Sequence, residues 1–410
     1  MTYDLFSALR LPREVLFGEG QVAAIGQVSA KFGTRALICT DARFATTAAF
    51  SEIINHLQAS NISFQVFDRV EPDVPCENVY ACVEAARPFS PDLVVGLGGG
   101  SCIDMAKCAS LILSHGGLLE NYYGEFKIPS RVLPIIAVPT TAGTGSEVTP
   151  VAVVSDSNRA LKVGISSPHL VPAAAICDPS LTWSCPAGLT AIAGADALTH
   201  AIEAFTALRR APDASLPQHH VFVGKNAFSD IFALKAISLI GQSLVLAFND
   251  GTHKQARSDL MLGALCAGCA FATTGTSLAH AVQYPIGALT HTAHGLGVAA
   301  MLPYAMTFNR WSSVAEMAEI ALALGVKAEG RSAAALSSEA ITRVKYLCKE
   351  VKIPSTLKEL GLAQDKIDWT AEQAIGIGRL IKNNPRPVEL DSMKTLLQAA
   401  YNGDFVAAAQ

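Results

Sequence analysis

"LVVGLGGGSCIDMAK", Leu93–Lys107, joins an apolar run to a glycine-rich turn and then to a helical pattern. Glycines let the backbone approach a ligand closely, and the amino terminus of the following helix offers N–H groups to an anion. The turn at Gly98, Gly99, Gly100 and Ser101 therefore suits a pyrophosphate group. Its spacing is not that of the common GxGxxG fingerprint, and such turns are also built for packing alone. We predict a strand, a turn and a helix at the start of a dinucleotide site.

Similar strand patterns lie on both sides of this turn. "RALICTDAR" and "SFQVFDRV" precede it, and "VLPIIAVPTTAGTGSE" follows it. Strands that alternate with helices predict a parallel sheet covered on both faces. After Pro186 the pattern changes to long helices at 187–206, 229–248, 258–271, 312–324 and 332–351, with no convincing strand. The predicted fold class is α/β: residues 1–185 form a parallel-sheet dinucleotide-binding domain, and residues 186–410 an all-helical metal-binding domain.

Two further strand ends carry candidates for cofactor binding. The segment "PTTAGTGSE" supplies the hydroxyls of Thr140, Thr141, Thr144 and Ser146, which suit phosphate and amide groups, although an ordinary capped turn has the same composition. Asp41 follows the first predicted strand. A carboxylate there accepts bonds from ribose hydroxyls and repels a 2′-phosphate, which favours NAD; the alternative is a helix cap.

The bulk composition limits the class of protein. Half of the 410 residues are apolar, 16% are charged and the net charge is -4, which indicates a globular enzyme and gives no electrostatic signal for nucleic acid. Leu260–Asn309 holds no Asp, Glu, Lys or Arg, but Pro285 and three histidines interrupt it, so we expect buried helices and no membrane span. The ten cysteines show no paired metal or disulfide spacing and predict reduced thiols in the cytoplasm. The apolar composition favours a homodimer or a larger homo-oligomer.

Four residues in the second half form a candidate metal site. Asp196 and His200 are four positions apart in a helical pattern, so they share one face, and His280 and His294 stand in the charge-free stretch. One carboxylate and three neutral imidazoles suit Fe²⁺, and Zn²⁺ also accepts this set. A single histidine is more often a satisfied core residue, but the four together favour a divalent metal.

These motifs resemble those of the iron-containing, or group III, alcohol dehydrogenases over almost the whole chain. The matching segments are the glycine turn with Asp104 and Lys107, Pro139–Glu147, Gly194–Leu198 with His200 and Glu203, His280–Pro285 with His294–Gly295, and "NNPRPVELDSMKTLLQAAYNGD". The resemblance implies that Asp196, His200, His280 and His294 bind the metal. It also assigns Lys162 to the cofactor site, together with Asp41 and the glycine and threonine loops.

The chain departs from the common family pattern at two places. Tyr284 stands where many members have a further histidine, and residues 208–228 form an insertion, which its prolines and lack of periodicity predict to be a surface loop. These features, with "HGLG" beginning at His294 in place of the usual "HGxxN", resemble the hydroxyacid–oxoacid transhydrogenase branch, which retains its nicotinamide cofactor. Tyr284 and His291 are the candidates for moving the substrate proton.

The resulting hypothesis is a metal-dependent oxidoreductase. It transfers a hydride between a small alcohol or hydroxy acid, or the aldehyde or ketone in reverse, and NAD, while the metal polarises the substrate oxygen. The first alternative is the transhydrogenase. A lyase of the dehydroquinate-synthase type and a non-catalytic metal- and nucleotide-binding protein are the more distant ones.

Overall fold

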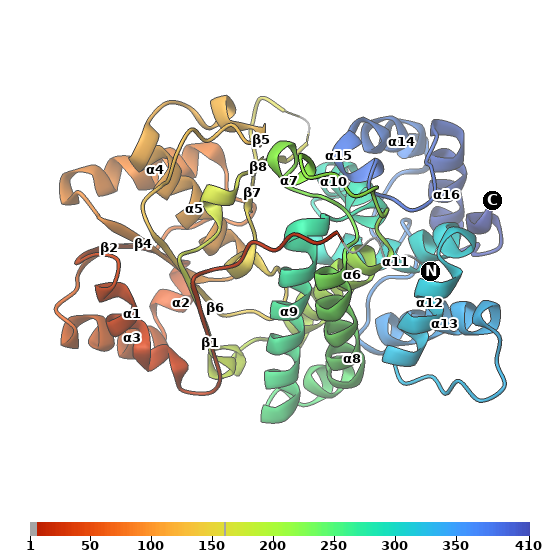
Figure 1. Ribbon diagram of the computed structural model, residues 1–410, viewed down its shortest axis with the longest axis horizontal. Helices are drawn as coiled ribbons and strands as arrows, with labels where there is room; N and C mark the ends of the chain where they lie inside the picture. Colours follow the sequence, from red (N-terminus) through yellow and green to blue (C-terminus); the bar gives the residue numbers. More distant parts are fainter. Residues whose placement is uncertain (1–5, 160) are drawn as a thin grey trace. The chain divides into compact units, whose positions relative to one another are not determined.

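The computed structural model describes residues 6–159 and 161–410, which form two compact units (Figure 1). Leu9–Cys185 and Pro217–Val221 belong to the sheet unit, and Pro186–Leu216 and Phe222–Gln410 belong to the helical unit. Two short segments lie in the other unit than the predicted boundaries 1–185 and 186–410 would place them. Residues 6–8 group with the helical unit, and Pro217–Val221 groups with the sheet unit because the Arg10 guanidinium donates to the carbonyls of Pro217 and Val221.

The sheet unit is built on six parallel strands in the order β1-β9-β6-β4-β2-β3. The four predicted strands are present as β2 (Arg35–Cys39), β3 (Ser63–Phe67), β4 (Leu93–Gly98) and β6 (Ile135–Pro139). Two strands were not predicted, the edge strand β1 (Glu14–Phe17) and its neighbour β9 (Ala174–Cys177). Both are four residues long, which is too short for a clear period of two.

Helices cover both faces of this sheet, as predicted. Alternate residues of β2 and β4 face opposite cores: Leu37 and Val94 pack with one cluster, and Ile38 and Val95 pack with another. The first cluster lies under α4 (Cys76–Ala86) and α5 (Gly100–His115), and the second lies under α1 (Ile25–Ala30) and α3 (Ala48–Ala59). The short α2 (Ala42–Ala45) follows β2.

A second, three-stranded sheet was not foreseen. It has the order β5-β8-β7, with β5 (Gly124–Glu125) parallel to β8 (Val163–Ser166) and β7 (Val151–Val154) antiparallel to β8. The β7–β8 pair contributes the buried side chains of Ala152, Val154 and Ile165 to the same core cluster as α4 and α5. The unit is therefore a parallel α/β layer with a small mixed sheet added to one face.

The helical unit contains no strand among its described residues, in agreement with the prediction. The α6 helix (Ala187–Thr206) has the predicted bounds, and α8 (Ala227–Asn249) and α9 (Lys254–Thr274) pack against it (Figure 1). The remaining helices of this unit are α10 (Leu278–Thr290), α11 (His294–Asn309), α12 (Val314–Ala323), α13 (Ala333–Glu350), α14 (Ile367–Gly376), α15 (Gly378–Ile381) and α16 (Leu390–Asn402). The short α7 (Leu216–His219) begins at the last residue of the segment Pro186–Leu216, and its other residues belong to the sheet unit.

The prediction of a surface loop at 208–228 is wrong for its second half. Residues 221–226 are buried, and the amide of Asn226 begins α8 by capping Ser229 N–H. Lys225 is also buried, where its ammonium donates to the carbonyl of Phe205 and to Asp230. A segment without regular secondary structure has no hydrophobic period, so periodicity could not predict that it is buried. The apolar run at Val221–Val223 is the feature of the sequence that indicates burial.

One described helix, α8, is long and apolar enough to cross a membrane, and α9 with α10 passes the same test as one pair bent by 99°. The test uses length and composition only, and core helices of soluble proteins pass it. The α8 helix packs against α6 and α9, and 44% of its most apolar stretch is buried.

Candidate metal centre and cofactor loops

One face of α6 carries three buried polar side chains. Asp196, His200 and Glu203 follow one another at intervals of four and three residues, and each is at most 5% exposed. Residues at this spacing lie one above the other on a helix. Because the helix is otherwise apolar, these three groups are taken out of water together, which is costly unless each of them is paired.

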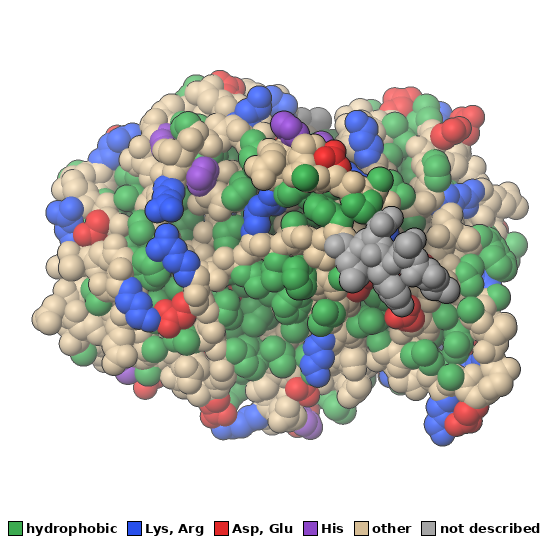
Figure 2. All heavy atoms as spheres, in the orientation of Figure 1, with side chains coloured by type: hydrophobic (Ala, Val, Ile, Leu, Met, Phe, Trp, Pro, Cys, Tyr) green, Lys and Arg blue, Asp and Glu red, His purple; other side chains and the backbone are tan. Residues whose placement is uncertain are grey.

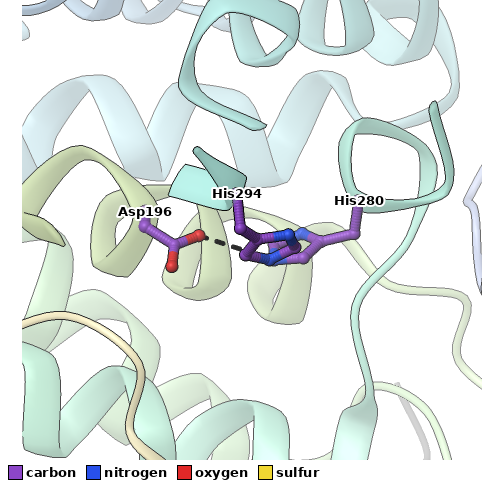
Figure 3. Close-up of side chains that lie close together, drawn as sticks. All are labelled: Asp196, His280 and His294. Carbon is purple, nitrogen blue, oxygen red and sulfur yellow. Dashed lines mark ion pairs between the residues drawn. The ribbon is translucent and has the colours of Figure 1, made fainter. Parts of the chain in front are cut away.

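His280 and His294 reach the same place from α10 and α11. His280 lies in the first turn of α10, and His294 is the first residue of α11. Asp196, His280 and His294 offer one ligand atom each, and these atoms all lie within 4.8 Å of one another (Figure 3). The fold thus joins residues that are almost a hundred positions apart in the chain into one cluster of metal-ligand type.

Two buried atoms of this cluster fit a metal ion. Asp196 Oδ1 and His280 Nε2 have no hydrogen-bond partner among the described residues, and they lie 3.7 Å apart. Two ligands of one ion, each about 2.1 Å from it, are separated by about 3 to 3.5 Å. Buried polar atoms are rarely left without a partner, so this donor set fits a divalent cation better than it fits a closed hydrogen-bond network.

Glu203 orients His280. Its carboxylate accepts from His280 Nδ1 at 2.6 Å, from Ser277 N at 2.8 Å and from Ala279 N at 2.7 Å. An ionised carboxylate only accepts, so the imidazole proton is on Nδ1 and the lone pair of Nε2 is directed to the cluster. The sequence argument named Glu203 only as part of a motif. Its spacing of seven residues from Asp196 was the signal that could have given it this role.

The two carboxyl groups have opposite pKa shifts. Burial raises the pKa of Asp196 to about 7, against the lowering effect of His280 and with a smaller rise from Glu203. Burial also acts to raise the pKa of Glu203, but His280 and the N–H groups of Ser277 and Ala279 together bring it below its usual value. Glu203 is therefore a fixed anion, whereas Asp196 gains from a cation placed beside it.

The other predicted residues of this site lie at different distances from the cluster. His200 Nε2 is 3.8 Å from Asp196 Oδ1, and the His200 ring stacks on those of Phe271 and His280. The Tyr284 ring centroid is 5.9 Å from that of His294. His291 is exposed and ends α10 with a φ of 55°, so the structure does not bring it into the cluster.

In the sheet unit, three predicted cofactor segments meet at one edge of the large sheet. β2 ends just before Asp41, β4 ends at Gly98 and β6 ends just before Thr140. These strands are neighbours, and Gly98 pairs with Pro139 in the register. Ligands of parallel α/β sheets bind at the carboxyl ends of the strands, so this edge is the expected place for a dinucleotide.

The glycine turn packs tightly against the threonine loop. A Cβ added at Gly100 would lie 2.6 Å from Thr144 Cγ2, and one added at Gly98, where φ is 153°, would lie 2.5 Å from Cys102 Sγ. The Asp41 carboxylate caps α2 by accepting from Phe44 N, so the helix-cap interpretation holds for one of its oxygens. Its other oxygen, Oδ2, would lie 3.7 Å from that added Cβ at Gly98.

Two buried charges on α5, Lys107 and Asp104, are linked through the hydroxyl of Ser146 in the threonine loop. Lys107 Nζ donates to Ser146 Oγ and to the carbonyls of Thr149 and Val151, while Asp104 accepts from Ser146 Oγ and Val153 N. Burial lowers the pKa of Lys107 to about 8 despite the neighbouring carboxylates. The hydroxyl of Ser146 is thus engaged within the protein, and its contact with a cofactor stays a prediction.

Lys162 and Asp73 form an ion pair near the glycine turn, with Nζ 2.5 Å from Oδ1. Asp73 N also donates to Ser101 Oγ, which links the pair to the glycine turn. Thr140 Oγ1 is buried and has no hydrogen-bond partner among the described residues. It is available to a ligand at this edge.

The comparisons with known proteins agree with this geometry. The model of the iron-containing alcohol dehydrogenase family matches residues 12–179, and the model of the carboxyl-terminal part of the Fe-containing alcohol dehydrogenase family matches residues 190–401. The chain belongs to the iron-containing alcohol dehydrogenase family. Members of this family are oxidoreductases that transfer a hydride in a metal-dependent reaction, and so is this chain.

Individual relatives of this iron-containing alcohol dehydrogenase match over most of its length. The long-chain-alcohol dehydrogenase 1 of Geobacillus thermodenitrificans is 34% identical and covers 90% of each chain. The NAD-dependent methanol dehydrogenase of Bacillus methanolicus is 31% identical over 95% of this chain and 98% of its own. The crystal structure of a 1,3-propanediol oxidoreductase has a TM-score of 0.90 at 30% identity and covers 97% of this chain and all of its own.

Proposed function

We propose that this enzyme oxidises small alcohols or hydroxy acids with NAD, and reduces the corresponding aldehydes or ketones in reverse. Asp196, His200, His280 and His294 hold its metal, which we assign as Fe²⁺, with Zn²⁺ as the other ion that suits the set. The observation that supports this most is the buried cluster of Asp196, His280 and His294, with two atoms that lack hydrogen-bond partners.

A divalent ion at this cluster supplies Lewis acidity to the substrate oxygen. The side chains of the protein contribute by orienting the ligands and by excluding water from the cluster. Glu203 keeps the proton of His280 on Nδ1, and the ring of Phe271 from α9 stacks on that of His200. We assign the substrate proton to the hydroxyl of Tyr284, because its ring lies beside His294, whereas His291 is exposed.

The cofactor assignment rests on the carboxyl edge of the large sheet. The turn Gly98–Ser101 and the hydroxyls of Thr140, Thr141 and Thr144 hold the pyrophosphate and the nicotinamide amide, and Asp41 accepts from the adenosine ribose. A carboxylate at that place favours NAD over NADP. The relatives include both an NAD-dependent methanol dehydrogenase and an NADPH-dependent butanol dehydrogenase, so the preference for NAD rests on Asp41.

A substrate panel with Fe²⁺ restored under anaerobic conditions, run with and without added NAD⁺, tests the proposal. We expect steady formation of NADH from NAD⁺ and at least one small alcohol or hydroxy acid. No turnover in a broad panel with the metal site loaded would contradict the dehydrogenase. The arm without NAD⁺ pairs a hydroxy acid with an oxo acid: turnover there, with retained nicotinamide in the purified protein, would instead establish the transhydrogenase that Tyr284 and the 208–228 insertion suggest.

We further propose that the enzyme works in the cytoplasm as a homodimer or larger homo-oligomer, without a membrane or nucleic acid. None of the ten cysteines forms a disulfide, and nine of them are buried, which suits a reducing compartment. Light scattering of the purified enzyme checks the oligomeric state, and a monomer would contradict that part of the proposal.

A further inference from the structure

A pocket lies in the sheet unit, away from the predicted cofactor loops. Its volume is about 340 Å³, and its lining includes the residues that directly precede three parallel strands: Arg13 before β1, Pro134 before β6 and Ala173 before β9. It therefore opens at the amino-terminal edge of the large sheet. The glycine and threonine loops follow the carboxyl ends of the same sheet, and strands of four to six residues at about 3.3 Å per residue separate the two edges by roughly 13 to 20 Å.

The charged and ionisable side chains in the lining of the pocket are all basic. Arg13, Arg131 and His169 line it, and no Asp or Glu does. None of the three makes an ion pair or a side-chain hydrogen bond within the described part of the chain. The nearest carboxylate in sequence, Glu14, is held by Lys31 at 2.6 Å. Figure 2 shows Lys, Arg and His side chains gathered on the surface of this unit.

The charges act on one another. Burial first, and then the positive charges of His115 and Arg131, lower the pKa of His169. His115 is itself close by, where its Nε2 contacts the carbonyl of Ser130, the residue before Arg131. Positive groups that repel one another without a carboxylate between them gain from an anion placed among them.

The remaining wall of the pocket is apolar. Phe32, Val132 and Pro168 contribute to it, and the Arg13 guanidinium carbon lies 5.9 Å from the Phe32 ring centroid. The volume is at the lower end of the range for small-molecule sites. A charged end between the two guanidinium groups and a compact apolar end against this wall would fill it.

We propose that this pocket binds a small organic phosphate, with the phosphate dianion between Arg13 and Arg131 and an apolar body against Phe32 and Val132. Two guanidinium groups match the two charges of a phosphate monoester and present paired N–H donors to its oxygens. His169 lies beside the same anion as a third donor. The site shares no residue with the metal centre and lies at the opposite edge of the sheet from the cofactor loops, so it does not rest on the proposed function.

The test uses the full enzyme with saturating NAD⁺, so that the cofactor site does not take up the probe. Binding of phenyl phosphate, inorganic phosphate and benzoate is measured by calorimetric titration. The imidazole signals are followed by NMR in parallel, and the signal of His169 is identified by its absence in His169→Gln. We expect phenyl phosphate to bind most tightly of the three and to move the His169 signal. Arg13→Gln and Arg131→Gln each weaken its binding about tenfold, by loss of charge-assisted hydrogen bonds.

Arg87→Gln is the matched control, because it removes the same charge from an exposed arginine of this unit that pairs with Glu84. The control binds phenyl phosphate like the parent. Equal affinity of the parent and both pocket variants, or an unmoved His169 signal at saturation, would overturn the proposed site. Inorganic phosphate or benzoate that binds as tightly as phenyl phosphate would overturn the assignment of the ligand class.

Discussion

The carboxylate of Glu203 offers the sharpest test of how the metal centre is organised. Glu203→Gln keeps the size of the side chain but leaves one acceptor oxygen for three donors, His280 Nδ1, Ser277 N and Ala279 N. The new amide NH₂ group must then face at least one of these N–H groups. In either orientation of the amide, the imidazole of His280 loses the charged acceptor that favours its proton on Nδ1, so its Nε2 becomes a weaker metal ligand.

The expected size follows from these contacts. Each charge-assisted hydrogen bond contributes about 1.5 to 3 kcal/mol, and breaking a buried charged pair costs about 3 to 5 kcal/mol. We therefore expect the free energy of unfolding to fall by about 3 kcal/mol or more. Loss of a carboxylate that orients a metal-binding histidine costs roughly 10- to 100-fold in metal affinity.

The assay measures metal bound per chain against a graded series of chelator concentrations, with chemical unfolding of the metal-free protein recorded in parallel. Glu339→Gln is the control, since that side chain is 44% exposed on α13 and pairs only with Arg331. The variant at Glu203 is expected to lose its metal at a chelator concentration 10- to 100-fold lower than the control does. A folded Glu203→Gln protein that retains metal as tightly as the parent would refute the orienting role.

Three further predictions concern the sheet unit. Gly100→Ala brings a Cβ to within 2.6 Å of Thr144 Cγ2, so NAD⁺ affinity by fluorescence titration is expected to fall about tenfold. Gly188→Ala, where the added Cβ meets nothing within 4 Å, leaves that affinity unchanged, and equal losses in both would argue against a shaped loop. Lys107→Met leaves the Asp104 carboxylate buried without a neighbouring cation, so the free energy of unfolding is expected to fall by about 3 to 5 kcal/mol. The double variant Lys107→Met with Asp104→Asn is expected to recover part of this loss. If the losses of the two single variants simply add in the double variant, Lys107 and Asp104 do not stabilise each other. Burial raises the pKa of Glu147 from 4.5 to about 7. The folded protein therefore holds this proton more tightly than the unfolded chain does, and the free energy of unfolding falls as the pH rises from about 4.5 through about 7. Glu147→Gln stays neutral, so its free energy of unfolding relative to the parent is expected to rise by up to about 3 kcal/mol over that window, and a pH-independent difference would contradict the assignment.

The sequence was most informative where one element carries a whole pattern. The spacing of Asp196 and His200 requires that both lie on one face of a helix, and α6 has the predicted bounds. The glycine turn between β4 and α5 was predicted for the same reason, because strand, turn and helix are continuous in the chain. Local spacing also contained Glu203, whose role could have been predicted from its position on that face.

Tertiary structure decided what depends on segments that are distant in the chain. The meeting of His280 and His294 with Asp196, and the choice of Nε2 of His280 as the free ligand atom, follow from the packing of α10 and α11 on α6 and from the bonds to Glu203. The strands β1 and β9 are too short to show a period, and their pairing with each other joins residues about 160 positions apart. Residues 221–226 have no regular period either, so only the fold shows that they are buried. Periodicity records the face of a single helix or strand, whereas the partner of that face is set by packing between elements.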